Sequence, residues 1–417
     1  MRIFGFGKDS IVSQARERLF SIENIAGLPS HGIRWQAYVD RMRQSIKELA
    51  SPDEVLRFAQ GSVGFEHRGN IHHEGKFTAQ YERELYAEFP HFGGEVDRFS
   101  DIEGSLADTT YEHKGRLVSN ILFYLTRVVL QCLTHIPATN TILEIGGGYG
   151  APARLWLSNP IRPAKCYIIL DIPESLFFAD VFLRREFGDA SIFYVENGKP
   201  LNSDVTSRYK VILCPLSRHT ALHTLAVDLA INTGSMQEMS EEWVDFYSLF
   251  LDNQQSRWFY SLNYFAQPIT YLAESTNVWS PRLSPRWIAR ALRWNPAFVR
   301  MQTDRNYLEA IYEKNGDPLP AASHLMELAK AMESRVMTGE LFVEYMDIVR
   351  REPTPRLMFA LVRRVMREMK FHPKEVTYLV NALLASTDDK TAGYIAELQG
   401  YKTMLLEERS AGTEAIY

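Results

Sequence analysis

Two acidic residues and a run of glycines stand where the chain could bind a cationic ligand. The stretch "ILEIGGGYGAPARLW" places Glu144 two residues before Gly146, Gly148 and Gly150, and "IILDIP" brings a second acid, Asp171. Glycine lacks Cβ and tolerates positive φ, so a ligand can come close to the backbone there. The carboxylates can attract a cation and accept hydrogen bonds from ribose hydroxyls. The chemistry indicated is the binding of a positively charged nucleoside.

Two nucleoside ligands compete for this loop. With Ala151 after them, the glycines also fit the dinucleotide pattern G-x-G-x-x-G/A, which alone is a weak signal. An acid beside the loop repels a pyrophosphate but attracts an ammonium group, so Glu144 favours S-adenosylmethionine over NAD. An NAD dehydrogenase would need no acid at position 144. The structural alternative is that Glu144 and Asp171 only cap helices and the glycines only form a turn.

The elements that must position these residues alternate between strand and helix. Helices are predicted from about Ala151, from about Pro173 to Phe187 and from about Ser240 to Asn253. Apolar runs bounded by turn residues, typical of strands buried on both faces, predict the strands "TILEIG", "CYIILDI", "KVILCPL", "VDLAINT" and "RWFYSLNYF". The alternation predicts an α/β fold with a doubly wound, Rossmann-like parallel sheet, which binds ligands beyond the carboxyl ends of its strands.

Three regions are predicted along the 417 residues. Residues 1–115 are expected to form a mostly helical N-terminal region with Gly- and His-rich loops that could reach a substrate. Residues 116–318 are expected to form the sheet domain, and residues 319–417 a helical C-terminal domain.

Composition narrows the class of protein. A content of 46% hydrophobic and 23% charged residues is typical of a soluble globular protein, and a formal charge of -5 gives no electrostatic reason to expect a nucleic-acid partner. The three cysteines are widely spaced in apolar runs, which supports neither disulfides nor a zinc site. No secretory signal is recognisable, and the longest apolar stretch contains Asn120, Arg127 and Gln131, which are costly in lipid. A cytoplasmic protein without a transmembrane segment is expected.

The motifs resemble those of a known superfamily. "LEIGGGYG" is similar to the first motif of the class I S-adenosylmethionine-dependent methyltransferases, an acid followed by G-x-G-x-G. Together with "IILDIPESL" and "INTGSMQEMSEEWVDFY" it resembles, more narrowly, the sugar O-methyltransferase family. The resemblance implies methyl transfer from S-adenosylmethionine to a hydroxyl of a sugar or glycan, such as a precursor of a surface polysaccharide or glycolipid.

The resemblance also implies a set of cofactor-binding residues. Glu144 would contact the amino group directly or through a neighbour, Asp171 would hold the ribose, and Ile172 would pack on the adenine. The backbone at Leu216 and Ser217 would border the adenine, although "CPLS" lacks the acid that often pairs with the adenine amino group. The loop itself would consist of Gly146, Gly148, Tyr149 and Gly150.

A sugar hydroxyl needs a base, or a metal that lowers its pKa, before it can attack a methyl group. Glu238, in "NTGSMQEMS", is the first candidate as base or substrate anchor, and an acid there can alternatively stabilise the start of the next helix. His219 and His223, between the third and fourth strands, are the other candidate bases, against the commoner structural role of a loop histidine. A divalent metal is left open, and no ligand pattern supports one.

Two segments are candidates for binding the acceptor. His72 and His73 lie in a glycine-bounded loop that either folds over the cleft or is simply exposed to solvent. Trp279, Arg282 and Arg286 follow the fifth strand, and aromatic faces stack on sugars while arginines bind carboxylates or phosphates. The alternative for Trp287 and Trp294, which are seven residues apart, is that they lie on one helix face and fill the core, and this is the favoured interpretation of those two residues.

Other functions compete with the leading one. The same cofactor could serve a non-sugar small molecule, or the chain could be a methyltransferase-like scaffold that acts through its helical tail. A basic run in that tail is expected to be a solvated helix face, with peripheral membrane contact as the alternative. Homo-oligomerisation is left open.

Overall fold

The computed structural model describes residues 8–22, 28, 33–61, 78–100, 111–118, 120–236, 239, 241–264, 267–268, 279–280, 294–302, 307–315, 380–381, 399 and 403. The chain divides into two compact units, Met1–Tyr260 and Ser261–Tyr417, with the boundary inside a strand.

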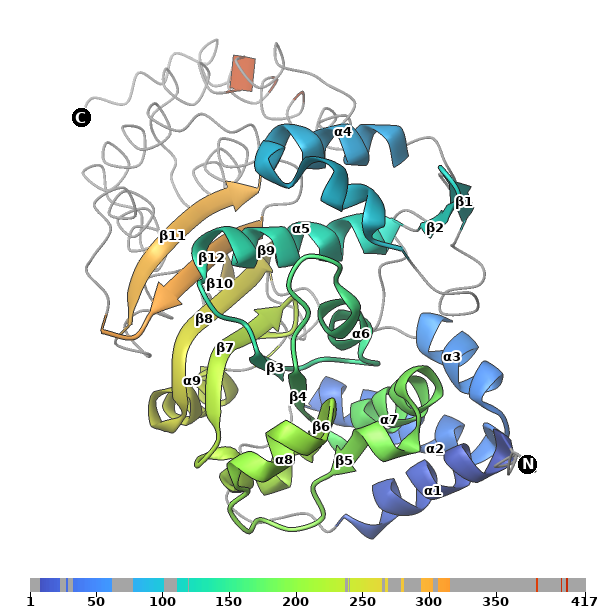
Figure 1. The fold of residues 1–417 in the computed structure, drawn as a ribbon. Helices are drawn as coiled ribbons and strands as arrows, with labels where there is room; N and C mark the ends of the chain where they lie inside the picture. Colours follow the sequence, from blue (N-terminus) through green and yellow to red (C-terminus); the bar gives the residue numbers. More distant parts are fainter. Residues whose placement is uncertain are drawn as a thin grey trace. The chain divides into compact units, whose positions relative to one another are not determined.

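Helices and strands alternate through most of the first unit (Figure 1). The α-helices are α1 (Lys8–Ser21), α2 (Ile33–Glu48), α3 (Pro52–Gly61), α4 (Thr78–Glu88), α5 (Asn120–His135), α6 (Ala151–Ser158), α7 (Pro173–Phe187), α8 (Ser203–Arg208) and α9 (Glu241–Asn253). The 3-10 helices are η2 (Pro90–Arg98), η3 (Asp189–Ser191) and η4 (Leu216–Leu222). The strands are β1 (Tyr111–His113), β2 (Arg116–Val118), β3 (Thr141–Ile145), β4 (Cys166–Asp171), β5 (Ile192–Tyr194), β6 (Val211–Pro215), β7 (Ala226–Thr233), β8 (Gln255–Tyr264), β9 (Gln267–Pro268), β10 (Trp279–Ser280), β11 (Asn295–Gln302) and β12 (Tyr307–Glu313).

The main sheet is mostly parallel, as the sequence predicts. Its strand order is β11-β12-β8-β7-β3-β4-β6-β5. Strand β3 pairs in parallel with both β4 and β7, and β6 pairs in parallel with β4 and β5. The chain therefore runs outward from β3 through β4 to β5, turns back to β6 between β4 and β5, and then crosses to β7 on the other side of β3. This change of side at β3 is the topological switch point of a doubly wound sheet, where ligands bind beyond the carboxyl ends of the strands.

The apolar runs that predicted the central strands are buried. Every residue of β4 and β6 is buried, as expected for strands covered by helices on both faces. Their fully buried aromatic neighbours include Trp156 of α6 and Phe177 of α7. These helices therefore pack on the sheet beside the ends of β3 and β4, next to the glycine loop and Asp171.

Three helices from the N-terminal region pack against α7. Helices α1, α2 and α3, here called the N-terminal layer, each contact α7 and gather around it (Figure 1). Ion pairs connect the two: Arg18 of α1 lies 2.6 Å from Asp180, and Arg185 lies 2.6 Å from Asp53 of α3. The layer thus braces the helix that directly follows Asp171.

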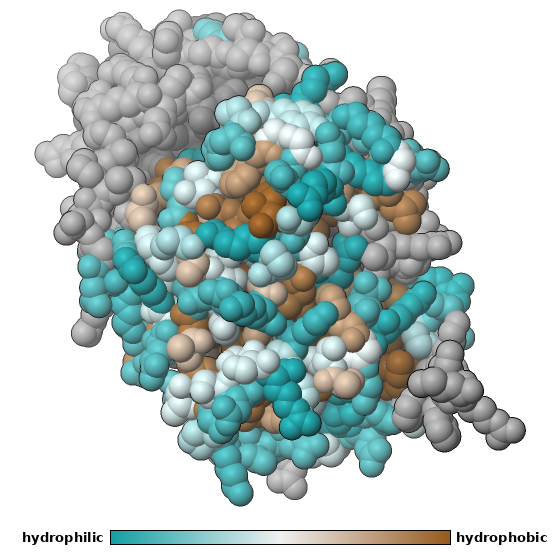
Figure 2. Space-filling view, viewed as in Figure 1, coloured by the Kyte–Doolittle hydropathy of each residue, from teal (hydrophilic) through white to brown (hydrophobic). Residues whose placement is uncertain are grey.

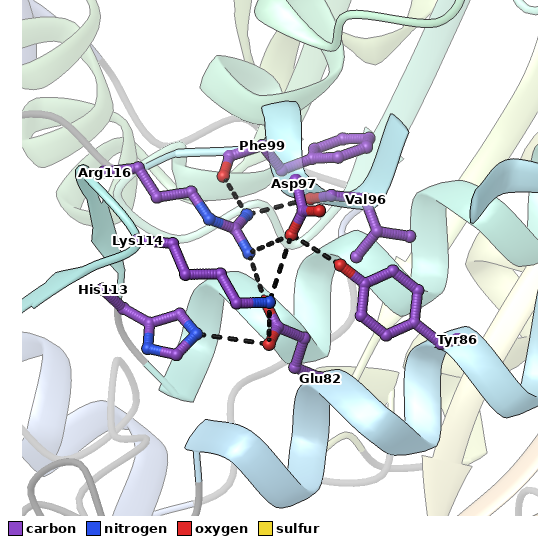
Figure 3. A network of polar contacts seen from close by, with 8 residues as sticks. All are labelled: Glu82, Tyr86, Val96, Asp97, Phe99, His113, Lys114 and Arg116. Atoms are coloured by element: carbon purple, nitrogen blue, oxygen red, sulfur yellow. Dashed lines mark hydrogen bonds and ion pairs between the residues drawn. The ribbon is translucent and has the colours of Figure 1, made fainter. Parts of the chain in front are cut away.

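The short hairpin β1–β2 was not predicted from the sequence. It lies against α4. Its two turn residues, Lys114 and Gly115, both have positive φ, as in a type I′ turn. Glu82 of α4 accepts hydrogen bonds from Lys114 at 2.7 Å and from Arg116 at 2.9 Å (Figure 3). Although burial opposes it, hydrogen bonds from Lys114 and His113 keep the pKa of Glu82 below its ordinary value. This network fixes the hairpin to α4.

The second unit departs from the predicted pattern where it is described. Strands β11 and β12 form an antiparallel hairpin that was not predicted from the sequence. Within it, Arg300 lies 2.7 Å from the buried Glu309. Of the predicted helical C-terminal domain only 380–381, 399 and 403 are described, each as helix. That domain and the predicted boundaries at 115 and 318 stay predictions.

The described surface is mostly hydrophilic on the face drawn in Figure 2, with smaller hydrophobic areas between. Within the described ranges, no helix is both long and apolar enough to cross a membrane.

Cys132, Cys166 and Cys214 are buried and unbridged, in agreement with the absence of a disulfide pattern in the sequence.

Candidate functional site

The glycine run forms the loop between β3 and α6. Gly146, Gly148 and Gly150 have φ values of 73°, 56° and 92°, a region that side chains with Cβ rarely enter. The Gly146 N–H donates to the carbonyl of Leu170 at 3.0 Å, which ties the loop to β4. A Cβ at Gly150 would lie 2.8 Å from the Leu183 side chain of α7. Conformation therefore favours glycine at all three positions, and at Gly150 the available space does so as well.

Glu144 lies fully buried beneath this loop. Its Oε2 accepts a hydrogen bond from the Tyr167 hydroxyl at 2.9 Å, and among the described residues nothing hydrogen-bonds Oε1. A Cβ at Gly147 would come within 2.8 Å of Glu144 Oε2, so glycine at 147 lets the backbone lie directly on the carboxylate. Burial, opposed by the Tyr167 hydrogen bond and reinforced by the charge of Asp171, raises the pKa of Glu144 to about 8.

The raised pKa predicts how the stability of the ligand-free protein depends on pH. The folded protein holds a proton on Glu144 up to about pH 8, whereas the unfolded chain loses it near the ordinary value of 4.5. Stability from this group is complete below pH 4.5 and is lost as pH rises towards 8, because the folded state binds the extra proton. Between pH 6 and pH 8, Glu144→Gln should therefore lose less stability than the parent, by roughly 2 to 3 kcal/mol.

Thermal melts of the two proteins at both pH values measure this difference. Asp171 is present in both proteins, and because its charge interacts with Glu144, the difference measures the titration of Glu144 together with its coupling to Asp171. Equal losses of stability in the two proteins would contradict a protonated Glu144.

Asp171 ends β4 and faces the same loop. Its Oδ2 accepts the Gly148 N–H at 3.0 Å, and its Oδ1 accepts the Ile172 N–H at 2.7 Å. Only 8% of the residue is exposed. Burial raises its pKa to about 7 against these backbone hydrogen bonds, with a further upward contribution from the charge of Glu174. The Ser175 side chain also hydrogen-bonds this carboxylate, so a ligand's hydroxyl groups would use the remaining acceptor position and replace Ser175 at another.

The end of β7 closes the other side of the loop. Asn232 is fully buried and donates to the Ile145 carbonyl at 2.8 Å and to the Ser235 hydroxyl at 2.5 Å. A Cβ at Gly146 would lie 2.2 Å from Ser235 Oγ. Neither Asn232 nor Ser235 was singled out from the sequence, although both stand in "NTGSMQEM", the motif that carried the narrower resemblance. They hold the two loops together at the switch point.

The remaining predicted cofactor residues lie around this centre. Ile172 is the N-cap of α7 and is buried, and Leu216 is buried at the start of η4. Tyr149 is 6% exposed and packs edge-on against the ring of Phe182, 5.4 Å away, on α7. Among the described groups nothing hydrogen-bonds the buried Ser217 Oγ.

The two candidate histidines belong to an aromatic cluster between η4 and α9. Their rings are 5.8 Å apart, and His219 lies 5.0 Å from Phe246 while His223 lies 5.5 Å from Phe250. His219 Nδ1 lies 3.0 Å from the Leu216 carbonyl, so Nδ1 carries the proton and Nε2 keeps its lone pair. Burial lowers the pKa of His219, which favours the neutral ring at pH 7.

Several predicted site residues cannot be placed. Glu238, His72, His73, Arg282 and Arg286 lie outside the described residues. Trp279 is described only as the first residue of β10. No cluster of three or more His, Cys, Asp or Glu side chains suited to a metal occurs within the described ranges.

The arrangement fits S-adenosylmethionine. Two carboxyl groups, Glu144 and Asp171, lie at the ends of adjacent parallel strands on either side of a backbone without side chains. Asp171 has acceptor positions for ribose hydroxyls, and a cation above the loop would favour the charged form of Glu144, whose Oε1 has no hydrogen-bond partner among the described residues. An anionic pyrophosphate would instead lie against the charge of Asp171 and oppose ionisation of Glu144.

Comparison with known proteins gives structural neighbours only. No protein-family model and no curated protein matches the chain. Among solved structures it is similar to the methyltransferase domain of bacterial CtHen1-CN, with 12% identity, a TM-score of 0.32, and 46% of this chain and 97% of that chain covered. It is also similar to TrmK of M. capricolum in complex with S-adenosyl-homocysteine, with 14% identity, a TM-score of 0.31, and coverage of 66% and 97%. A third similar structure is the N-terminal domain of EvdMO1 with S-adenosyl-homocysteine bound, with 14% identity, a TM-score of 0.26, and 55% of this chain and 95% of that chain covered. At these TM-scores the likeness carries no argument, and the fold class rests on the strand order of this chain.

Proposed function

We propose that this chain is an S-adenosylmethionine-dependent methyltransferase of class I. The observation that carries the proposal is the position of Asp171, which is hydrogen-bonded to the glycine loop at the switch point with acceptor positions for ribose hydroxyls. The proposed role of Asp171 is to accept both ribose hydroxyls. Glu144, fully buried, is proposed to act on the cofactor's amino group through the loop backbone rather than by direct contact.

The proposed reaction is O-methylation. The cofactor supplies an electrophilic methyl group, and the protein must align an acceptor hydroxyl with it and remove the hydroxyl proton. His219 is neutral near pH 7 and keeps a lone pair on Nε2, which suits a base. Glu238 follows the β7 loop that contacts Gly146 and remains the first candidate by sequence.

The proposed acceptor is a sugar or glycan, and the proposed compartment is the cytoplasm. Support for the sugar comes from "NTGSMQEM" and its neighbours, the motif combination that resembles the sugar O-methyltransferase family. Of these residues, Asn232 and Ser235 have a defined place in the site, where they brace the glycine loop.

Methyl-labelled cofactor identifies the acceptor directly. The chain is incubated with the labelled cofactor and separate pools of nucleotide sugars, glycans, non-sugar metabolites and RNA, and products are analysed by mass spectrometry. A labelled methyl ether on a sugar is the expected product. Label in a non-sugar metabolite or RNA would keep the methyltransferase and reject the sugar, whereas no label in any pool would favour a scaffold.

Glu238→Gln should leave S-adenosylhomocysteine affinity within about twofold of the parent and reduce kcat by about 100-fold or more, as for loss of a general base. The glutamine keeps the size of the side chain but cannot take a proton. Glu242→Gln is the matched control, because Glu242 is an exposed acid at the start of the neighbouring α9. Unchanged turnover in Glu238→Gln would remove Glu238 from the chemistry and leave His219 as the better candidate.

A further inference from the structure

The first turn of α7 carries a second buried acid beside the proposed ribose-binding residue. Glu174 follows Asp171 by three positions and is only 2% exposed. An acid in the first turn of a helix is stabilised by the helix dipole. A second negative charge so close to Asp171, however, opposes ionisation of Asp171. A positive charge beside Glu174 is therefore needed to offset its effect on Asp171.

That compensation comes from the N-terminal layer. The Nε of Arg43, on α2, donates to Oε1 of Glu174, and the two residues are 131 positions apart in sequence. The Arg43 side chain is 38% exposed, whereas that of Glu174 is 3% exposed, so the guanidinium closes the solvent side of the buried carboxylate. Because α1 and α3 also pack on α7, the position of Arg43 is set by a packed layer of three helices.

The other groups near these carboxyls are few among the described residues. Asp171 is surrounded by the Gly148 and Ile172 N–H groups, the Ser175 side chain, Glu144 of β3 and Tyr247 of α9. Glu174 is near Asp171, Arg43 and Tyr194 of β5. Arg43 is the cation that reaches Glu174 in the described structure.

We propose that Arg43 is a positioning residue for the cofactor site: by pairing with Glu174 it allows Asp171 to carry its charge when ribose binds. This inference rests on the proposed function, because it assigns the N-terminal layer a part in cofactor affinity. Binding that requires a charged Asp171 strengthens as pH rises through the pKa of Asp171 in the free protein. The pH midpoint of binding is therefore the quantity that Arg43 controls.

Substitutions at the pair should shift this midpoint in opposite directions. Arg43→Met leaves Glu174 uncompensated, so the midpoint for S-adenosylhomocysteine binding should rise by about 0.5 to 1 unit, and affinity below it should fall about three- to tenfold. Glu174→Gln removes the opposing charge, so the midpoint should fall. The double variant Arg43→Met/Glu174→Gln should return to or below the parent midpoint, and Arg43→Lys should stay near it.

Calorimetric titrations with S-adenosylhomocysteine from about pH 5.5 to pH 8 test this, after circular dichroism shows that each variant is folded. Glu144 is the same in every variant, so differences in midpoint report on Asp171. Arg185→Met is the matched control: it removes the Arg185–Asp53 pair between the same layer and α7, away from Asp171, and should not move the midpoint. If Arg43 only holds α2 in place, affinity falls equally at every pH and Glu174→Gln does not rescue it.

The outcomes separate the two proposals. Binding by the parent protein with identical midpoints in all variants overturns the role of Arg43 and keeps the proposed function. No binding by the parent at any pH overturns both. If Arg43→Met does not fold, a lowered midpoint in Glu174→Gln supports the inference and an unchanged one rejects it.

Discussion

Asp171→Ala is expected to weaken S-adenosylhomocysteine binding by roughly 100-fold, or about 3 kcal/mol, because two hydrogen bonds from ribose hydroxyls to a carboxylate are lost. The substitution also frees the Gly148 and Ile172 N–H groups that Asp171 now holds. The loop then loses its hydrogen bond to β4 at Gly148, where the cofactor is proposed to lie, and keeps the one from Gly146 to Leu170. Calorimetric titration measures the change in affinity.

Asp228→Ala is a close control for this variant. Asp228 also accepts two backbone N–H groups, from Asn140 at 2.7 Å and Thr141 at 3.1 Å, but at the start of β3, the opposite edge of the sheet. Its loss should lower stability and leave affinity within about threefold, since no bond to the cofactor is involved. Similar affinity losses in both variants would mean that Asp171 acts only through stability.

Gly146→Ala is expected to lower cofactor affinity by 100-fold or more, on the order of 3 kcal/mol, through displacement of the loop. The added Cβ would lie 2.2 Å from Ser235 Oγ and 2.7 Å from Ser235 Cβ, so Ser235 must move as a whole. Ser235 is held by Asn232 and donates to the Ile145 carbonyl, so it cannot move without breaking these bonds. The positive φ adds a backbone cost of about 1 to 2 kcal/mol.

Gly188→Ala separates the backbone cost from the steric one. Gly188 has a φ of 79°, close to the 73° of Gly146, yet a Cβ there would meet nothing within 4 Å. This control should lose stability from strain, because a φ of 79° with a ψ of 153° is a combination that residues with Cβ rarely adopt, but it should bind cofactor normally. Normal binding by Gly146→Ala would show that the contact between the loops after β3 and β7 is not needed for the site.

The parts of the site that were predictable from sequence are those encoded in short segments. Buried apolar runs identify β3, β4, β6 and β7, and the ends of parallel strands must meet at one edge, which brings Glu144 and Asp171 together. The glycines also pointed to a backbone that a ligand can approach closely. That Gly147 lies on the carboxylate of Glu144 could not be foreseen, because it depends on the direction of a side chain beneath the loop.

The parts that could not be predicted depend on contacts between distant segments. Arg43 and Glu174 lie 131 positions apart, and nothing in either local sequence indicates the pair. Strand β5 has only three residues and the hairpin β1–β2 has three in each strand, too short for a visible alternation of apolar and polar residues. The contact between Tyr167 and Glu144 could not be predicted either, because the Tyr167 hydroxyl reaches Glu144 only when β3 and β4 are adjacent.

Titration of the parent protein with S-adenosylmethionine, and separately with NAD, tests the proposed site most directly. Carboxyl groups at the tips of β3 and β4 and a glycine-rich loop predict one molecule of S-adenosylmethionine or S-adenosylhomocysteine bound per chain. They also predict no detectable NAD binding, and a rise in melting temperature with S-adenosylmethionine or S-adenosylhomocysteine alone. Binding of NAD in preference to S-adenosylmethionine, or of neither ligand, would contradict the cofactor assignment.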